Sequence, residues 1–213
     1  MSPAALDYEL PTAGKPELAF VGRSNVGKSS LVGALLNNVN LVRISRSPGC
    51  TKNVNYFKFA SRRGSAECYL VDLPGYGFAR SSKEDRDKWG KTIRSFLKNR
   101  SYTIMKRVYL LIDSRHPIKE SDVEMMNVLN ECDLSYQVIL TKADISSAQE
   151  KIACLQSTFN EMMSKRHANG YPIVHVVSSH NGLGLEPLKQ SIAEIVYTDG
   201  TDDISGQVLE TEI

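Results

Sequence analysis

The chain has 213 residues, of which 41% are hydrophobic and 23% charged, and a net charge of +2. This length and composition predict one domain with a buried hydrophobic core. No run approaches the roughly 18 apolar residues that cross a bilayer, and the N-terminus lacks a secretory pattern, so we expect a soluble protein. The 4 cysteines form no C-x-x-C pair, which indicates neither a zinc site nor a disulfide framework and favours a reducing compartment.

Charge is distributed unevenly along the chain. Residues 198–213 contain five acids and no Lys or Arg, so the rest of the chain carries +7 and this tail is expected to be disordered. Basic residues cluster at 43–63, with six and no acid, and at 80–107, with ten against three acids. Either cluster is suited to contact a polyanion such as RNA, and a solvated charged surface is the plainer alternative.

Short apolar runs alternate with helical patterns. Strands are predicted at 18–21, 54–59, 68–71, 108–112, 136–140 and 173–177. Helices are predicted at 28–37, 85–98, 120–131, 147–167 and 184–196. The alternation predicts an α/β fold of three layers, a mostly parallel six-stranded sheet with helices on both faces. Because only a turn separates the second strand from the third, one antiparallel edge strand is expected.

The first predicted strand runs into a match to the phosphate-binding pattern G-x-x-x-x-G-K-[ST]. The matching residues are Gly22, Arg23, Ser24, Asn25, Val26, Gly27, Lys28 and Ser29, with Ser30 next. The glycines let the backbone curl so that successive N–H groups point at phosphate oxygens, and the helix N-terminus adds partial positive charge. We expect Lys28 to reach the outer phosphates and Ser29 to bind Mg²⁺.

The third predicted strand is followed by Asp-Leu-Pro-Gly at 72–75. Ligands bind beyond the carboxyl ends of the strands in such sheets, so Asp72 is expected to serve the Mg²⁺ shell and Gly75 to offer its N–H to the terminal phosphate. Thr51 lies between the two motifs, in a loop expected at 40–53 that also carries Gly49. Its hydroxyl is expected to join the metal only while the terminal phosphate is present. The predicted catalytic groups are Lys28, Thr51 and Gly75, and the predicted metal ligands are Ser29, Thr51 and Asp72.

The fifth predicted strand is followed by Thr-Lys-Ala-Asp at 141–144. Asp144 can accept from both the ring N–H and the exocyclic amine of guanine, a pair of donors that adenine lacks. Lys142 is expected to pack its stem on the purine, and Ser178 and Ser179 to place backbone N–H groups near the guanine carbonyl. The alternative is that Asp144 or Ser146 only caps the following helix.

These segments together resemble the EngB (YihA/YsxC) family of ribosome-assembly GTPases. The matching text is GRSNVGKSS at 22–30, SPGCTKNVNYF at 47–57, VDLPGYGFA at 71–79, TKAD at 141–144 and VSS at 177–179. The resemblance implies a P-loop GTPase domain at 16–197, between an extension at 1–15 and a tail at 198–213. It also implies Mg²⁺ on Ser29 and Thr51, and GTP or GDP on residues 25–30, Thr141, Lys142, Asp144, Ser178 and Ser179.

The resemblance also implies a nucleotide-dependent switch in assembly of the large ribosomal subunit. Its expected partner is ribosomal RNA or a pre-ribosomal particle, and we expect a monomer in the cytoplasm, or in an organelle if a leader is removed. Tyr76 stands where many GTPases have a water-orienting Gln, so intrinsic hydrolysis is expected to be slow. Asn25 resembles the residue with which some GTPases hold K⁺, and a polar residue tolerated in a tight loop is the alternative. The competing function is a protein-binding switch in cell division or signalling.

Overall fold

The computed structural model describes residues 14–36, 43–46, 54–60, 67–76, 93–100, 104–164 and 168–197. The strands are β1 (Glu17–Gly22), β2 (Arg43–Arg46), β3 (Asn55–Ala60), β4 (Glu67–Asp72), β5 (Met105–Asp113), β6 (Tyr136–Thr141) and β7 (Gly170–Val176). The helices are α1 (Lys28–Leu35), α3 (Glu120–Glu131), α4 (Ala148–Met162) and α5 (Leu185–Tyr197), and residues 93–98 are also helical.

The strands form one sheet in the order β2-β3-β4-β1-β5-β6-β7. From β4 to β7 every pairing is parallel, whereas β3 runs antiparallel to both β4 and β2. The expected fold class is confirmed, with all six predicted strands present. The structure adds a seventh strand, β2, within the segment expected to be a loop, so the antiparallel strand β3 lies one place in from the edge of the described sheet.

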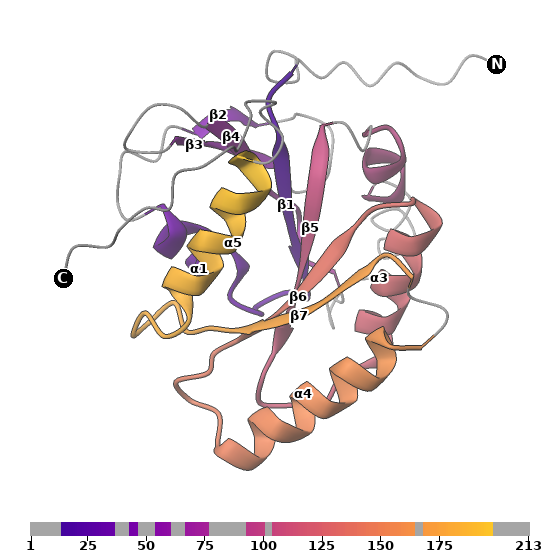
Figure 1. Ribbon diagram of the computed structural model, residues 1–213, viewed down its shortest axis with the longest axis vertical. Helices are drawn as coiled ribbons and strands as arrows, with labels where there is room; N and C mark the ends of the chain where they lie inside the picture. Colours follow the sequence, from indigo (N-terminus) through magenta and orange to yellow (C-terminus); the bar gives the residue numbers. More distant parts are fainter. Residues whose placement is uncertain are drawn as a thin grey trace, which may run out of the picture.

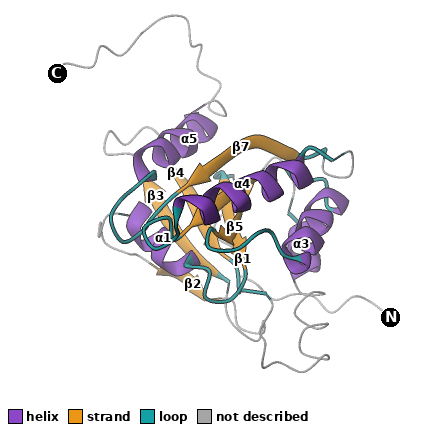
Figure 2. Cartoon of the chain, turned by 90° about the horizontal axis from the view of Figure 1, so that it is seen from below, coloured by secondary structure: helices purple, strands orange, loops and turns teal. Residues whose placement is uncertain are grey.

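Helices cover both faces of the sheet, α1 and α5 on one side and α3 and α4 on the other (Figures 1 and 2). Alternate residues of each central strand enter opposite cores, because successive side chains of a strand point to opposite faces. In β1, Leu18 and Phe20 pack with α1 and α5, whereas Ala19 and Val21 pack on the face of α3 and α4. The sheet is therefore buried on both faces, as a parallel sheet requires.

Most predicted elements differ from the observed ones only at their ends. The largest extensions are in β5, which begins at Met105 rather than 108, and β7, which begins at Gly170 rather than 173. Helix α4 ends at Met162, short of the predicted residue 167. The helix predicted at 85–98 is described only from residue 93 onward, and the acidic tail lies outside the described residues.

Strand β7 lies at one end of the described sheet. Its first half is exposed, with Tyr171 and Ile173 among the large apolar residues that reach solvent. Cys68, Cys132 and Cys154 are free thiols, and Cys50 lies outside the described residues. Among the described helices, none is long and apolar enough to cross a bilayer.

Candidate functional site

The segment between β1 and α1 curls into an open cavity at the carboxyl end of the sheet. Gly27 caps the helix with φ 101° and ψ 18°, a left-handed conformation that side chains disfavour. At Gly22 a side chain would not fit, because an added Cβ would lie 2.9 Å from the carbonyl oxygen of Leu111. The cavity measures about 300 Å³, and its lining residues are Arg23, Ser24, Asn25, Gly27, Lys28, Ser29, Ser30 and Gly75, all of them predicted site residues.

Asp72 lies beside this cavity because β4 pairs in parallel with β1, opposite Phe20. Its carboxylate forms an ion pair with the Lys28 ammonium and accepts a hydrogen bond of 3.2 Å from the Ser29 hydroxyl. The hydroxyl and the carboxylate are the hard oxygen donors that Mg²⁺ prefers, and the adjacent loop N–H groups and ammonium suit phosphate oxygens. The residues present therefore fit a phosphate with its magnesium ion.

The chain after β4 continues to pair with the phosphate loop. Tyr76 N–H donates to the Gly22 carbonyl at 3.1 Å, and Ser24 N–H donates to the Tyr76 carbonyl at 2.9 Å. Gly75 sits so close that an added Cβ would lie 3.0 Å from the backbone nitrogen of Ser24. A larger residue here would press on the Ser24 backbone, and the glycine lets this backbone form part of the cavity wall.

The side chain of Tyr76 points away from the cavity into the core. It is 4% exposed, and its hydroxyl donates to a carboxylate oxygen of Asp122 on α3 at 2.7 Å. Burial, followed by the neighbouring Asp122, raises the pKa of Tyr76 well above its ordinary value. Burial also raises the pKa of Asp122, although hydrogen bonds from Tyr76 and the Lys119 N–H oppose it. A hydrogen bond between two buried side chains thus fixes the segment that follows Gly75.

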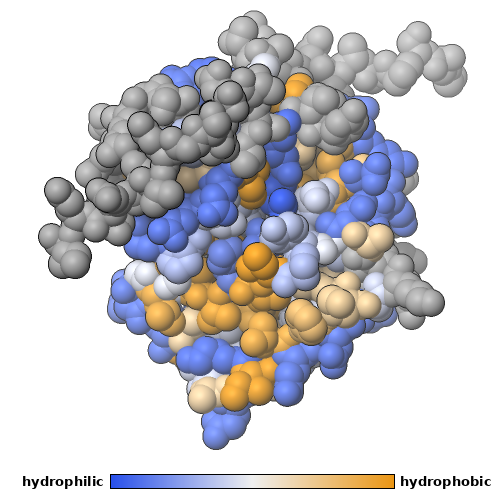
Figure 3. Space-filling model, in the orientation of Figure 1, coloured by the Kyte–Doolittle hydropathy of each residue, from blue (hydrophilic) through white to orange (hydrophobic). Residues whose placement is uncertain are grey.

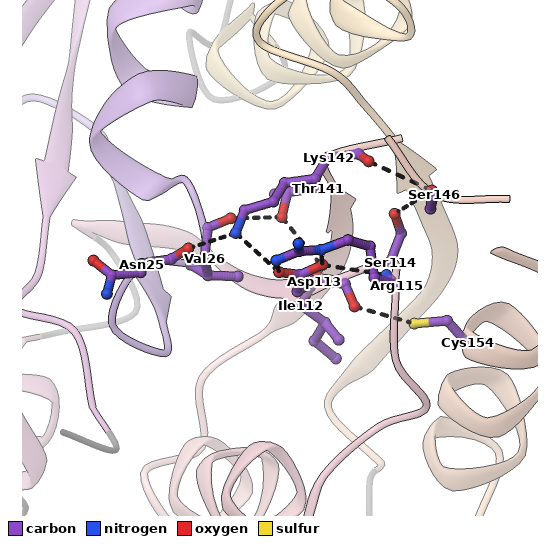
Figure 4. Close-up of polar contacts among 10 residues, drawn as sticks. All are labelled: Asn25, Val26, Ile112, Asp113, Ser114, Arg115, Thr141, Lys142, Ser146 and Cys154. Carbon is purple, nitrogen blue, oxygen red and sulfur yellow. Dashed lines mark hydrogen bonds and ion pairs between the residues drawn. The ribbon is translucent and has the colours of Figure 1, made fainter. Parts of the chain in front are cut away.

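The last residue of β6 and the residue after it are joined to the 22–30 loop by their side chains (Figure 4). The buried Thr141 hydroxyl donates to the Val26 carbonyl at 2.7 Å. The Lys142 ammonium donates to the Asn25 carbonyl at 2.7 Å and to the Asp113 carboxylate at 2.9 Å. Two segments more than a hundred residues apart in sequence are therefore held together in space.

Asp144 lies next to the loop that follows β7. A hydrogen bond from the Ser178 side chain lowers the pKa of Asp144, and the ring of His180 lies 3.8 Å from its carboxylate. The capping alternative is wrong, because the N-cap of α4 is Ser147, whose hydroxyl accepts from the Glu150 N–H. Asp144 is therefore bonded to the loop after β7 rather than used as the cap of α4.

One expected contact does not fit the structure. The backbone N–H of Ser178 donates to the Leu183 carbonyl at 2.9 Å, so it is not free for a guanine carbonyl. The Ser178 hydroxyl instead accepts from the His180 and Asn181 N–H groups. Ser179 is half-buried next to it. The predicted residues Gly49 and Thr51 lie outside the described residues.

Sequence reasoning missed Asp113 and Arg115, which belong to the same network. Asp113 ends β5 and binds the Arg115 guanidinium through both carboxylate oxygens, at 2.9 and 2.7 Å. The sequence does contain a signal that could have identified Asp113, because this residue directly follows a predicted strand, as Asp72 and Thr141 do. Burial alone would raise the pKa of Asp113, but hydrogen bonds from Arg115 and Lys142 outweigh it and hold the pKa well below its usual range.

The basic cluster at 80–107 is only partly described, and three of its arginines have internal partners. Arg94 forms an ion pair with Glu131, and Arg100 donates to the buried Glu17 at 2.8 Å. Arg107 lies over the ring of Tyr171, 4.3 Å from its centroid. Among the described residues of this cluster, the exposed Lys98 remains available for an external anion.

Comparisons with known proteins place these features in one family. The family model described as "50S ribosome-binding GTPase" matches residues 17–142. The probable GTP-binding protein EngB of Bartonella quintana is 43% identical over 191 residues, which cover 88% of this chain and 87% of that protein. Its counterpart in Rhizobium etli is 44% identical over 191 residues, with 88% and 86% covered.

Solved structures have the same fold. The crystal structure of a probable GTP-binding protein engB matches with a TM-score of 0.58 and 24% identity, over 85% of this chain and 99% of that one. The G domain of the T. maritima FeoB iron transporter matches with a TM-score of 0.56 and 26% identity, over the same shares. With the 22–30 loop and Gly75 lining one cavity and Asp72 bonded to Lys28 and Ser29 of that loop, the chain belongs to the EngB family of GTP-binding proteins and is a GTPase.

Proposed function

We propose that the cavity binds the phosphates of GTP or GDP with Mg²⁺, and that the region around Asp144 binds the guanine base. The convergence of Lys28, Ser29 and Asp72 at the cavity carries this proposal, because it combines the phosphate-binding and metal-binding groups of a nucleotide site. Residues 16–197 form the GTPase domain in this proposal, between an extension at 1–15 and the acidic tail at 198–213.

Each group has a defined part in hydrolysis. Ser29 and Asp72 would hold Mg²⁺, with Thr51 joining in the GTP form, and the bound ion neutralises charge that develops on the phosphates. Lys28 exchanges its partner Asp72 for the phosphate oxygens. The Gly75 N–H, at the wall of the cavity, is the donor for the terminal phosphate.

Intrinsic hydrolysis is slow in this proposal. A water-orienting Gln provides an amide at the position after Gly75, whereas here that position is Tyr76. The Tyr76 side chain is buried in the core on Asp122, so it offers no group to align an attacking water. An additional cation, such as K⁺ beside Asn25, or a partner molecule supplies the missing stabilisation.

Nucleotide titrations test the site directly. Fluorescent GDP should bind with Mg²⁺ and more weakly after chelation, and Ser29→Ala should remove most of that dependence on Mg²⁺. Ser95→Ala, at an exposed position of the helical segment 93–98, is the matched control and should behave as wild type. Full dependence on Mg²⁺ in the Ser29→Ala protein would exclude Ser29 as a ligand.

The proposed role of the switch is in assembly of the large ribosomal subunit. The description of the matching family model as a 50S ribosome-binding GTPase supports this role, as do the basic clusters at 43–63 and 80–107. Lysine and arginine contacts to RNA phosphates need no further motif. The protein acts in this proposal as a monomer in the cytoplasm, on ribosomal RNA or a pre-ribosomal particle.

Co-sedimentation with purified large-subunit particles tests this role. Binding should be stronger with a non-hydrolysable GTP analogue than with GDP, and should fall steeply as salt rises, because phosphate contacts release counterions. Lys98→Glu should weaken binding without changing GTP affinity. The control is Lys189→Glu, at a lysine whose partner is Glu186 on its own helix. Binding that ignores nucleotide and salt would refute the role.

A protein-binding switch in cell division or signalling is the second candidate. The observation that favours it is an apolar stripe along α4, formed by Ile152, Leu155, Phe159 and Met163, which are all exposed. Figure 3 shows apolar surface gathered around α4 and β7. Contiguous exposed apolar surface is typical of a protein partner rather than of RNA. Particle binding that survives high salt but is lost in Phe159→Glu would support this candidate.

A further inference from the structure

Both carboxylate oxygens of Asp113, at the end of β5, accept hydrogen bonds. One oxygen accepts from the Arg115 backbone N–H at 3.2 Å and from its Nε at 2.9 Å. The other accepts from the Arg115 Nη2 at 2.7 Å and from the Lys142 Nζ at 2.9 Å. Arginine holds a carboxylate in a fixed plane through its forked donors. Arg115 thus orients Asp113, and the orientation places one oxygen at Lys142.

Lys142 connects two restrained backbone positions. Its own φ is 61°, and the Asn25 whose carbonyl it contacts has a φ of 63°. Residues other than glycine occupy this left-handed region only when their surroundings hold them there. The lysine stem has four flexible carbons and an ammonium group that rotates freely. A contact that joins two such positions therefore needs a fixed counter-charge to persist.

We propose that Asp113, oriented by Arg115, is a positioning residue that holds the Lys142 ammonium on the Asn25 carbonyl and so keeps the base-reading segment and the phosphate loop in one nucleotide-binding geometry. This inference rests on the proposed nucleotide site, in which Lys142 packs on the purine. In Figure 4 the Lys142 ammonium lies between the Asn25 carbonyl and the Asp113 carboxylate. Asp113 is not among the residues that line the cavity.

The carboxylate is suited to this task over the whole physiological range. The hydrogen bonds from Arg115 and Lys142 overcome the effect of burial and keep the pKa of Asp113 low, so the group stays ionised. Its side chain is 17% exposed and that of Lys142 25%, so water screens the pair only partly. The ion pair is therefore stronger than one at the open surface.

The Asp113–Lys142 contact should affect the binding of GDP and of GTP equally. Lys142 lies at the base end of the site, whereas Gly75 and Thr51 are the groups assigned to the terminal phosphate. Loss of the Asp113 contact should therefore speed the release of GDP and of a GTP analogue by the same factor. A change in the preference between the two nucleotides is not expected.

The test is a double-mutant cycle on the full-length protein, read as the dissociation rate of fluorescent GDP. Asp113→Asn keeps the shape of the side chain but removes its charge, and should raise the rate about tenfold, as for the loss of a charge-assisted hydrogen bond. In a Lys142→Met background the same change should have an effect below about twofold, because the group through which it acts is gone. Glu186→Gln, which breaks an exposed ion pair on α5, is the control and should leave the rate unchanged.

The outcomes separate this inference from the proposed function. Unchanged GDP release in Lys142→Met would refute the assignment of Lys142 to the nucleotide site itself. Faster release in Lys142→Met, with no effect of Asp113→Asn or an equal effect in both backgrounds, would overturn the positioning role alone. The same cycle with Arg115→Ala in place of Asp113→Asn tests the residue that orients Asp113. This second cycle decides the question if thermal unfolding shows that the Asp113→Asn protein is not folded.

Discussion

Tyr76→Phe removes one hydroxyl group and nothing else from the segment after Gly75. In the wild type this hydroxyl donates to the buried Asp122 at 2.7 Å, and Asp122 accepts a further hydrogen bond of 3.2 Å from the Lys119 N–H. The variant keeps the aromatic ring in the core but leaves one carboxylate oxygen of Asp122 without this donor. The change therefore isolates the hydrogen bond from the packing of the ring.

The expected cost follows from burial of both partners. Tyr76 is 4% exposed and Asp122 is 1% exposed, so water cannot easily replace the lost donor. Leaving a buried acceptor unsatisfied costs about 1–3 kcal/mol. In a protein of this size each kcal/mol lowers the melting temperature by about 2–4 °C. We expect a decrease of roughly 4–8 °C, near the middle of that energy range.

The pH dependence of this cost has a defined sign. The Tyr76 hydroxyl stabilises the ionised form of Asp122, so its removal raises the pKa of that carboxyl further in the folded state. The native variant then binds a proton where the unfolded chain does not, and its deficit in stability is larger at high pH than near pH 4. Chemical denaturation at several pH values measures both the deficit and its slope.

The control for this experiment is Tyr171→Phe. Tyr171 is 42% exposed, and its ring, which lies under Arg107, remains in the variant. Its stability should stay within about 0.5 kcal/mol of the wild type. A loss below about 0.5 kcal/mol for Tyr76→Phe, with no dependence on pH, would show that the Tyr76–Asp122 bond contributes nothing and would refute the reasoning.

Three further predictions concern the nucleotide and the core. Asp144→Asn should weaken GTP binding by about 1.5–3 kcal/mol and shift preference toward xanthosine nucleotides. Titrations with GTP and with xanthosine triphosphate measure this, and a change in GTP affinity of less than about threefold would contradict the assignment of Asp144 to the base. Turnover should be faster in potassium than in sodium for the wild type and equal in both for Asn25→Ala, and equal wild-type rates would end the potassium hypothesis. Burial raises the pKa of Glu17 to about 7 despite its pairing with Arg100, so its contribution to stability is present below its unfolded value of 4.5 and is lost as pH rises to about 7. Glu17→Gln should remove that slope in denaturation curves, and an unchanged slope would assign it to another group.

Local patterns were sufficient to predict the central strands and the motifs that follow them. Each of β1, β5 and β6 contains a buried apolar run, at 18–21, 108–112 and 138–140, which the sequence pattern identifies without tertiary information. Strand β2 could not be predicted this way, because Arg43–Arg46 has one apolar residue, Ile44, and no alternating pattern, and it pairs with β3 as a strand. Its existence depends on a neighbour rather than on its own composition.

The hydrogen bonds and ion pairs between distant residues of the site could not be predicted from the sequence. Asp113 and Lys142 are 29 residues apart and Tyr76 and Asp122 are 46 apart, and each pair meets only because the sheet order brings their elements together. The same holds for the Ser178 N–H, which looked free in the sequence but is bonded to Leu183 within the turn after β7. Sequence motifs locate chemical groups, whereas the fold decides which of their atoms are already used.

Strand β7 combines an exposed apolar surface with a position at the end of the described sheet, which is a hazard for self-association through strand addition. Pro172 stands between the two exposed residues Tyr171 and Ile173 and has no N–H to donate to an incoming strand. Such a proline interrupts the hydrogen-bond ladder that amyloid-like stacking requires. Pro172 thus weakens the backbone of this edge as a template for other chains, where its neighbours expose apolar side chains.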